Sequence, residues 1–248
     1  MEEISVLIPA YKPKDSELKI IESNKKILMS DRRVKEIITN NVKGYANARQ
    51  DLLSKAKYNL ILWLDADIEL LKNPIDFFLN KMKKDDKIVG VCGTTEFYGK
   101  DWKIHMLNAI TKAKEDYLKN DYDAWERIFE FSLFKREPLV KEGFDTNFNE
   151  GGEDDDLMYR LKKSGFKIIR TKEVKAKHHY DTKNFWKKMS SYKKGSNKLL
   201  EKYGYIERPN VEISFFKEIK QFIVNLFKMG KPHYLFLYPI WKFKRVRC

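Results

Sequence analysis

Cysteine is scarce in this chain of 248 residues: Cys92 lies in an apolar run and Cys248 is the last residue. Two cysteines so placed make neither a disulfide framework nor a zinc site, so we expect a reducing compartment. Long apolar runs are also missing, since no stretch approaches the roughly 18 apolar residues of a membrane-spanning helix. Residues 1–4, Met-Glu-Glu-Ile, lack the basic start and apolar core of a signal peptide, and we expect a cytoplasmic protein.

Internal repeats and low-complexity segments are absent as well. The composition, 42% hydrophobic and 35% charged, is typical of a globular protein with a highly charged surface. A chain of this length can bury a sizeable core as one large domain or as a domain with an appendage.

Positive charge is concentrated near the end of the chain. Residues 183–248 hold 16 Lys and Arg against 4 Asp and Glu, a surplus of 12 within a net charge of +14. The first 182 residues hold 34 Lys and Arg against 32 Asp and Glu. A nearly neutral body argues against a nucleic-acid partner. A basic tail that also carries apolar residues favours an anionic membrane surface.

Apolar periodicity predicts alternating strands and helices in the first 92 residues. Strands are expected at 4–9, 34–39, 59–64 and 87–92, and helices at 17–28, 47–57 and 73–83. This order predicts an α/β fold with a mostly parallel sheet and helices on both faces. Residues 94–127 show no clear pattern. Beyond them, strands are expected at 128–135 and 166–170, with a helix at 153–164 that Gly165 ends.

The third expected strand ends in two carboxylates, Asp65 and Asp67, separated by Ala66. In open α/β sheets, ligands bind at the carboxyl ends of the strands. Two acids so close repel each other unless positive charge lies beside them. Hard oxygen ligands suit Mg²⁺ or Mn²⁺. A metal ion that carries a phosphate ligand would therefore offset the repulsion between the two acids and account for a ligand at this edge. The alternative is a strand followed by an acidic turn.

Four acids, residues 153–156, open the expected helix at 153–164. The helix dipole favours acids at this end, so capping explains some of them but does not require four. Arg160 lies four residues after Asp156, and an ion pair on the helix surface would explain both residues. Crowding raises the pKa of at least one acid, which suits a proton acceptor near neutral pH.

Four segments resemble, in order, the motifs of the inverting GT-A glycosyltransferases of family 2. They are Ser5–Tyr11, Gly44–Gln50, Leu64–Asp67, and Glu142–Asp145 followed by Gly152–Leu161. The resemblance spans residues 4–182 and implies a GT-A fold, a Rossmann-like sheet flanked by helices. Gln50 stands where the family more often has Asn.

The resemblance implies a role for each matched position on the donor side. Donor contacts are implied for Pro9, Ala10 and Tyr11 at the end of the first strand, and for Asp65 and Ala66. Arg49 is a candidate for binding the diphosphate. Asp67 is implied to bind a divalent metal, Mn²⁺ or Mg²⁺, which neutralises charge on the departing diphosphate. The other interpretation of Asp67 is a capping or turn acid.

On the acceptor side, the resemblance implies that Asp154 is the general base. It would take a proton from the acceptor hydroxyl as that oxygen attacks the anomeric carbon. Glu153 and Asp156 are placed beside it, with orientation or capping the expected role of Asp156. A metal-binding histidine is implied at His178, with His179 a near-equal alternative. The other interpretation is a pair of surface histidines.

One segment departs from the family pattern. An acidic segment with an Asp that contacts the nucleotide base usually follows the second strand, but here residues 39–43 read Thr-Asn-Asn-Val-Lys. Asn40 or, as we prefer, Asn41 is expected to bind the base instead. A UDP-sugar is favoured because UDP is the family's commonest carrier, with GDP and dTDP left open.

The remaining residues, 183–248, are expected to form a basic helical appendage to a catalytic domain at 1–182. A helix is expected at 183–203, and an amphipathic one at 214–228 whose apolar face comprises Phe215, Ile219, Phe222, Ile223, Leu226 and Phe227. Aromatic residues at 234–241 precede four basic residues. Binding to an anionic membrane and packing on the domain or on a second subunit are both open.

These features predict a metal-dependent inverting glycosyltransferase on the cytoplasmic face of a membrane. Its donor would be a nucleotide-diphosphate sugar, and its acceptor a hydroxyl of a lipid-linked compound or a glycan. A nucleotidyltransferase is a second hypothesis, but no Gly-rich phosphate loop follows the first strand. A basic nucleic-acid-binding module is a third, and the nearly neutral body argues against it.

Overall fold

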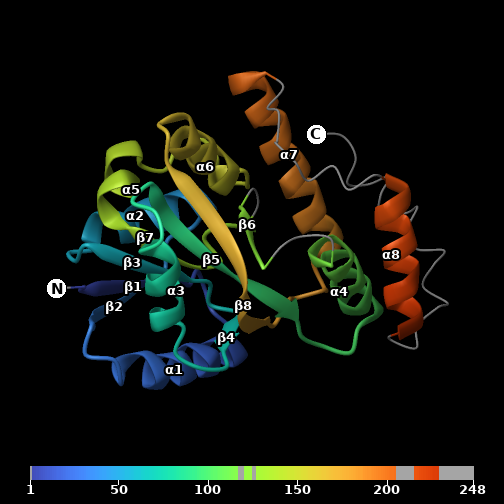
Figure 1. Ribbon diagram of the computed structural model, residues 1–248, viewed down its shortest axis with the longest axis horizontal. Helices are drawn as coiled ribbons and strands as arrows, with labels where there is room; N and C mark the ends of the chain where they lie inside the picture. Colours follow the sequence, from blue (N-terminus) through green and yellow to red (C-terminus); the bar gives the residue numbers. More distant parts are fainter. Residues whose placement is uncertain (1, 117–119, 125–126, 205–214, 229–248) are drawn as a thin grey trace.

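A computed structural model describes residues 2–116, 120–124, 127–204 and 215–228. A central twisted sheet lies between helices, and helices α4, α7 and α8 stand together at one end of it (Figure 1). The strands are β1 Ile4–Pro9, β2 Val34–Asn40, β3 Leu60–Leu64, β4 Ile68–Leu70, β5 Ile88–Phe97, β6 Asp121–Asp123, β7 Phe131–Lys135 and β8 Lys167–His178. The helices are α1 Asp15–Met29, α2 Tyr45–Lys55, α3 Ile75–Met82, α4 Trp102–Glu115, α5 Arg136–Glu142, α6 Glu153–Lys163, α7 Phe185–Tyr203 and α8 Phe215–Lys228.

Among the described residues, the strands form one mixed sheet in the order β2-β1-β3-β7-β5-β8-β4, with β6 paired to β8. Strands β1, β2, β3, β5 and β8 run in one direction, and β4, β6 and β7 run against them. The carboxyl ends of β1 and β3 therefore meet at one edge, beside the end of β8. This edge carries the acids that follow β3.

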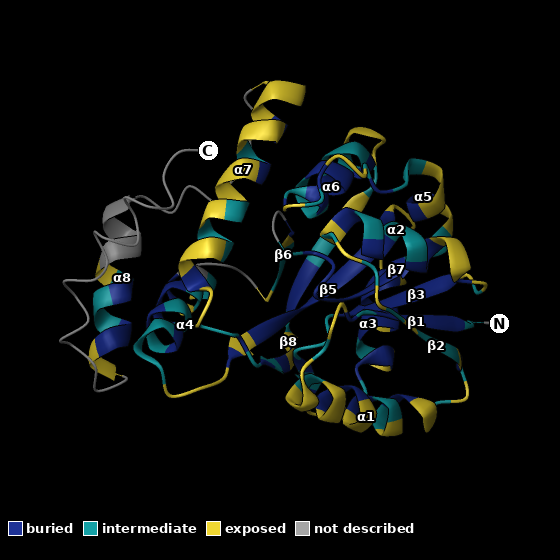
Figure 2. Ribbon diagram, turned by 180° about the vertical axis from the view of Figure 1, so that it is seen from behind, coloured by how far each residue is buried: buried dark blue, intermediate teal, exposed yellow. Residues whose placement is uncertain are grey.

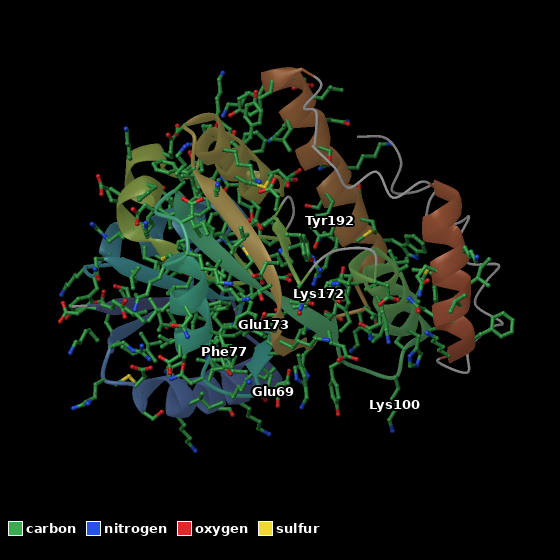
Figure 3. All side chains as sticks on the ribbon, viewed as in Figure 1. Glu69, Phe77, Lys100, Lys172, Glu173 and Tyr192 are labelled. Carbon is green, nitrogen blue, oxygen red and sulfur yellow. The ribbon has the colours of Figure 1, made fainter. Side chains whose placement is uncertain are left out.

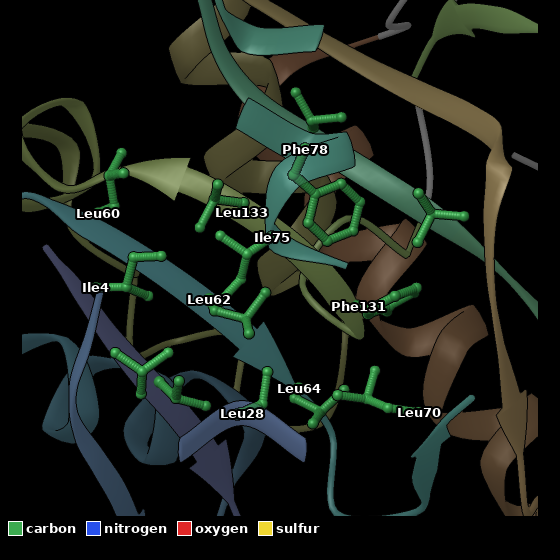
Figure 4. Close-up of a cluster of buried hydrophobic side chains, with 14 of the residues drawn as sticks. Ile4, Leu28, Leu60, Leu62, Leu64, Leu70, Ile75, Phe78, Phe131 and Leu133 are labelled. Carbon is green, nitrogen blue, oxygen red and sulfur yellow. The ribbon is translucent and has the colours of Figure 1, made fainter. Parts of the chain in front are cut away.

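Both faces of the sheet are covered, so its strands are buried on both sides (Figure 2). On one face, α1 and α3 pack on the sheet, where Phe78 of α3 lies in one cluster with Ile4 of β1 and Leu62 of β3 (Figure 4). On the other face, α2, α5 and α6 enclose Trp63 and Phe134. Burial on both faces explains why β1 and β3 read as continuous apolar runs rather than as alternating patterns.

The expected elements are present, and the α/β fold with helices on both faces is confirmed. The structure adds β4, α4, β6 and α5, for which no prediction was made. Strand β8 runs to His178 rather than ending at Arg170, because its second half pairs with β4 and with the end of β5. Strand β7 starts at Phe131 and not at 128. A short antiparallel strand such as β4 has too few residues to show a period.

The helices of the appendage pack against the rest of the molecule. Helix α8 lies beside α4, where Phe222 and Leu226 are buried in a small third core with Ile110. Phe227 stays exposed. The side chains of Phe215 and Ile219, and the whole expected segment 234–247, lie outside the described part of the chain. No helix among the described residues is long and apolar enough to cross a bilayer.

Candidate active site

The acids after β3 sit in a turn that neighbouring backbone holds in place. The Asp65 N–H donates to the Glu130 carbonyl at 2.9 Å, and the Ile68 N–H donates to the Asp65 carbonyl at 3.0 Å. The His179 N–H donates to the Asp67 carbonyl at 2.8 Å. The turn is thus fixed both to the segment before β7 and to the end of β8, which brings residues more than 100 positions apart together.

Asp67 and His178 face each other across this junction. Asp67 Oδ2 lies 3.2 Å from His178 Nε2. Burial alone would raise the pKa of Asp67, but the His178 charge holds that pKa below its ordinary value. Burial likewise lowers the pKa of His178, and the Asp67 charge outweighs it so that the net shift is upward. The two side chains contact each other at the edge of the sheet.

This pair fits a divalent metal. Two ligands bound about 2.1 Å from one ion at a right angle are about 3 Å apart, close to the separation of Asp67 Oδ2 and His178 Nε2. A carboxylate and an imidazole form a donor set that Mn²⁺ accepts. No group of three or more His, Cys, Asp or Glu side chains converges on a metal position within the described residues. Other ligands would therefore come from substrate or water.

His179 lies in a different contact. Its Nε2 is 2.6 Å from Glu69 Oε2, and Lys177 Nζ is 3.3 Å from the other oxygen of the same carboxylate. Of the two candidate histidines, only His178 contacts Asp67 through its side chain, whereas His179 contacts it through its backbone N–H. Figure 3 shows Glu69 on β4, beside the end of β8.

Arg49 joins the two acidic segments. It is buried in α2, with Nη2 at 3.2 Å from Asp65 Oδ1 and Nη1 at 3.0 Å from Asp154 Oδ1. Nη1 also pairs with the Glu153 carboxylate. The guanidinium was expected to contact the diphosphate, but here it donates to Glu153 and Asp65 and lies at ion-pair distance from Asp154. In this structure Arg49 therefore links the acids of the site.

One guanidinium faces three carboxylates, and the pKa values of two of these acids, Asp65 and Glu153, are raised. Burial, opposed by Arg49, raises the pKa of Asp65 to about 7. Burial and the neighbouring Asp154 charge raise the pKa of Glu153 well above its ordinary value. Glu153 is the least exposed of these acids, whereas 18% of the Asp154 side chain is exposed to solvent. Asp154 is therefore the member of the acidic pair that is better placed to meet a substrate.

Asp156 points away from this cluster. It is fully buried, with Oδ2 at 2.7 Å from Arg160 Nη2 and Oδ1 accepting from Lys202 Nζ and Tyr203 Oη, each at 2.7 Å. The ion pair expected between Asp156 and Arg160 is present. These contacts tie α6 to α7 and account for the side chain of Asp156 without a substrate.

The expected donor-side residues line the end of β1. Pro9 ends the strand, the Ala10 N–H donates to the Asn40 carbonyl at 3.3 Å, and Tyr11 is 44% exposed. Asn41 Oδ1 accepts the Lys12 N–H at 2.8 Å, so Asn41 lies beside this loop. The methyl group of Ala66 packs against the core, which leaves only its backbone for a donor contact.

The side chain of Asn40 stabilises α2. Its Nδ2 donates to the Ala48 carbonyl at 2.8 Å and to Asp51 Oδ2 at 2.9 Å. Gln50, the departure from the family's usual Asn, accepts the Phe144 N–H at 2.8 Å. Both amides hold α2 in place beneath the site.

Helix α7 packs against the loop that leads into α6. Gly195 approaches the Gly151 backbone so closely that a Cβ atom there would lie 2.4 Å from the Gly151 oxygen. Lys198 Nζ donates to the Asn147 carbonyl at 2.7 Å, and Lys194 pairs with Glu150 at 2.8 Å. The loop that leads into Glu153 is therefore held by the first helix of the appendage.

Sequence reasoning missed three residues of the surroundings of His178 and Tyr180, which are Glu130, Lys188 and Tyr192. Glu130 is buried, with Oε2 3.8 Å from His178 Nδ1, and Lys188 Nζ lies 4.2 Å from the centre of the Tyr180 ring, which packs on His178. An acid inside the apolar run 128–134 was the available signal for Glu130. Lys188 and Tyr192 of α7 carried no such signal, and Figure 3 shows Tyr192 on the side of α7 that faces the sheet.

The model of the family described as glycosyl transferase family 2 matches residues 5–143, more than half of the chain. The chain belongs to glycosyl transferase family 2. The match includes Arg49, Asp65 and Asp67 of this family 2 chain and ends before Glu153. A search of curated proteins finds no match.

Two solved structures share the fold of this family 2 chain. The crystal structure of GalNAc-T7 with UDP, GalNAc and Mn²⁺ is 15% identical with a TM-score of 0.58, covering 98% of this chain and 57% of that one. The mannosyltransferase PcManGT from Pyrobaculum calidifontis, in complex with GDP-Man and Mn²⁺, is 12% identical with a TM-score of 0.60, covering 92% and 75%. With the family match, they confirm the expected GT-A fold.

Proposed function

We propose that this chain is a metal-dependent inverting glycosyltransferase that moves a sugar from a nucleotide-diphosphate sugar to a hydroxyl acceptor. The observation that carries the proposal is the link through Arg49. It joins Asp65, at the edge that also holds Asp67 and His178, to Asp154 at the start of α6. A donor site and a proton acceptor thus lie on either side of one buried cation.

Asp67 and His178 would hold a Mn²⁺ or Mg²⁺ ion, with the nucleotide diphosphate providing further ligands. Such a metal neutralises negative charge on the leaving diphosphate. Pro9, Ala10, Tyr11 and Asn41 would bind the nucleoside at the end of β1. UDP is favoured and GDP is the alternative; the two structural relatives were solved with UDP and with GDP-Man.

Asp154 would take the proton from the acceptor hydroxyl. As that oxygen attacks the anomeric carbon, the bond from this carbon to the diphosphate breaks on the opposite side, which inverts the configuration. Arg49 and the buried Glu153 orient the Asp154 carboxylate. A general base of this kind contributes a rate factor of about 10² to 10⁴.

The acceptor is proposed to be a glycan or a lipid-linked compound at an anionic membrane surface. Support for the membrane comes from residues 229–248, which hold five Lys and Arg, no Asp or Glu, and five Phe, Trp and Tyr residues. Basic residues near an anionic bilayer contribute about 1 kcal/mol each. Part of the α8 apolar face packs against α4. The proposed membrane contact therefore depends on residues 229–248.

The experiment is hydrolysis of a panel of UDP-sugars and GDP-sugars with and without Mn²⁺, for the wild type and for Asp67→Asn. Metal-dependent hydrolysis is expected in the wild type and its loss in Asp67→Asn. Asp76→Asn, a change at an exposed acid of α3, is the matched control and should keep full activity. Hydrolysis that persists in Asp67→Asn or in the absence of metal would contradict the metal role.

A further inference from the structure

Glu130 is a buried acid that the proposed reaction leaves without a role. Only 5% of its surface is exposed, and it lies just before β7 in a strongly apolar segment. A buried carboxylate is costly unless it is paired or hydrogen-bonded. We therefore expect the Glu130 carboxylate to have polar partners, and its two oxygens contact different side chains.

One oxygen of Glu130 is held in place. Thr95 Oγ1 of β5 donates to Glu130 Oε1 at 2.8 Å, and Arg127 Nη1 lies 3.5 Å from the same oxygen. These two contacts come from different elements and fix the orientation of the carboxylate. They leave Oε2 directed elsewhere.

The other oxygen, Oε2, lies 3.8 Å from Nδ1 of His178. That nitrogen is buried and has no hydrogen-bond partner among the described residues. The opposite ring nitrogen, Nε2, is the one that faces Asp67. Phe97 stacks on the imidazole with ring centres 5.1 Å apart, so the ring is also held from its flat side.

On the basis of the proposed function, we propose that Glu130 is a positioning residue for the metal ligand His178. When Nε2 binds a metal ion, the ring proton resides on Nδ1, and the Glu130 carboxylate accepts it. A carboxylate behind a ligating imidazole fixes the tautomer and raises the basicity of the ligand, and its loss typically lowers metal affinity 10- to 100-fold. Thr95 acts through Glu130 by holding its second oxygen.

The experiment measures the Kd of the full chain for Mn²⁺ from the electron paramagnetic resonance signal of free Mn²⁺, with UDP and with GDP in separate titrations. Glu130→Gln, which keeps an acceptor oxygen without its charge, should raise Kd about 10-fold. Glu130→Leu, which removes the acceptor, should raise it towards 100-fold. Thr95→Val should also raise Kd, but by a smaller factor.

Glu36→Gln is the matched control. Like Glu130, Glu36 is a carboxylate that accepts from a hydroxyl, that of Ser5 at 2.6 Å, but it lies in β2 away from His178. Its variant should bind Mn²⁺ as the wild type does. Thermal unfolding of each variant separates folding defects from metal binding, because a purely structural role would lower Tm and leave Kd unchanged.

If both Glu130 variants bind Mn²⁺ with the wild-type Kd, the positioning role of Glu130 is overturned, while the proposed function of the chain still stands. Should Glu130→Leu fail to fold, Glu130→Gln and Thr95→Val decide the question. A wild-type chain that binds no Mn²⁺ with either nucleotide would instead overturn the proposed function, so the two failures are distinguishable.

Discussion

Arg49 Nη1 lies 3.0 Å from Asp154 Oδ1, and this buried ion pair joins the start of α6 to the acids that follow β3. Arg49 is itself 5% exposed. Burying a guanidinium is tolerated because three carboxylates surround it. Those carboxylates in turn depend on Arg49, since buried acids without a cation repel one another.

Replacing Arg49 with Met is therefore expected to destabilise the fold by about 3–5 kcal/mol, because it leaves buried acids without their partner. Arg49→Lys keeps the charge but loses the fork that reaches Asp65 and Asp154 together, and should cost less stability. Urea unfolding measures both. Equal stability of the Met variant and the wild type would show that the acids do not need Arg49.

The contact between α7 and the loop before α6 gives a second prediction. Gly195→Ala places a methyl group 2.4 Å from the Gly151 oxygen, which is backbone and cannot rotate away. We expect a loss of about 1–3 kcal/mol in stability and a reduced turnover, because the loop that leads into Glu153 must shift. Thermal unfolding and donor hydrolysis measure the two effects.

Asn197→Ala is the control for Gly195→Ala. It changes an exposed residue of the same helix, and Ala is the better helix former, so stability should hold or rise slightly. If Gly195→Ala has the same thermal stability and the same rate of donor hydrolysis as this control, α7 does not position the loop.

The sequence predicted much of the fold and part of the site. Buried strands such as 60–64 are continuous apolar runs, so their identity and direction follow from local pattern and order. The pairing of His178 with Asp67 could not be derived in this way, because β4 brings them together and is only three residues long. The position of Arg49 among three acids also depends on packing between α2 and α6, which no spacing in the sequence records.

A third prediction concerns acid stability. Asp31 accepts hydrogen bonds from Arg33 and Asn73, and these lower its pKa from the ordinary 3.8 to about 2. A lowered pKa contributes stability that is present above the ordinary pKa and is lost as the pH falls from about 4 towards 2. Asp31→Asn should therefore cost up to about 2 kcal/mol at pH 7.

At pH 3 the difference between Asp31→Asn and the wild type should be clearly smaller than at pH 7, as measured by urea unfolding at both values. Asp76→Asn serves as a control, because its side chain is 74% exposed and its pair with Arg33 contributes little. A destabilisation by Asp31→Asn that is independent of pH would contradict the assignment to its charge.

The proposed membrane contact is tested by removing residues 229–248, which leaves α8 and its buried Phe222 in place. We expect weaker co-sedimentation with vesicles that contain phosphatidylserine, no change in Tm, and wild-type binding that falls as salt is added. Neutral phosphatidylcholine vesicles are the control. Undiminished binding by the shortened chain would remove the tail from this role.

The most direct test of the proposed reaction is Asp154→Asn, assayed for donor binding and for turnover on the same preparation. The account predicts a nearly unchanged Kd for the nucleotide-diphosphate sugar with Mn²⁺, because Asp67 and His178 are intact. It predicts that turnover falls by at least about 10²-fold, because the general base is lost. Turnover equal to that of the wild type, with the donor bound, would contradict the account.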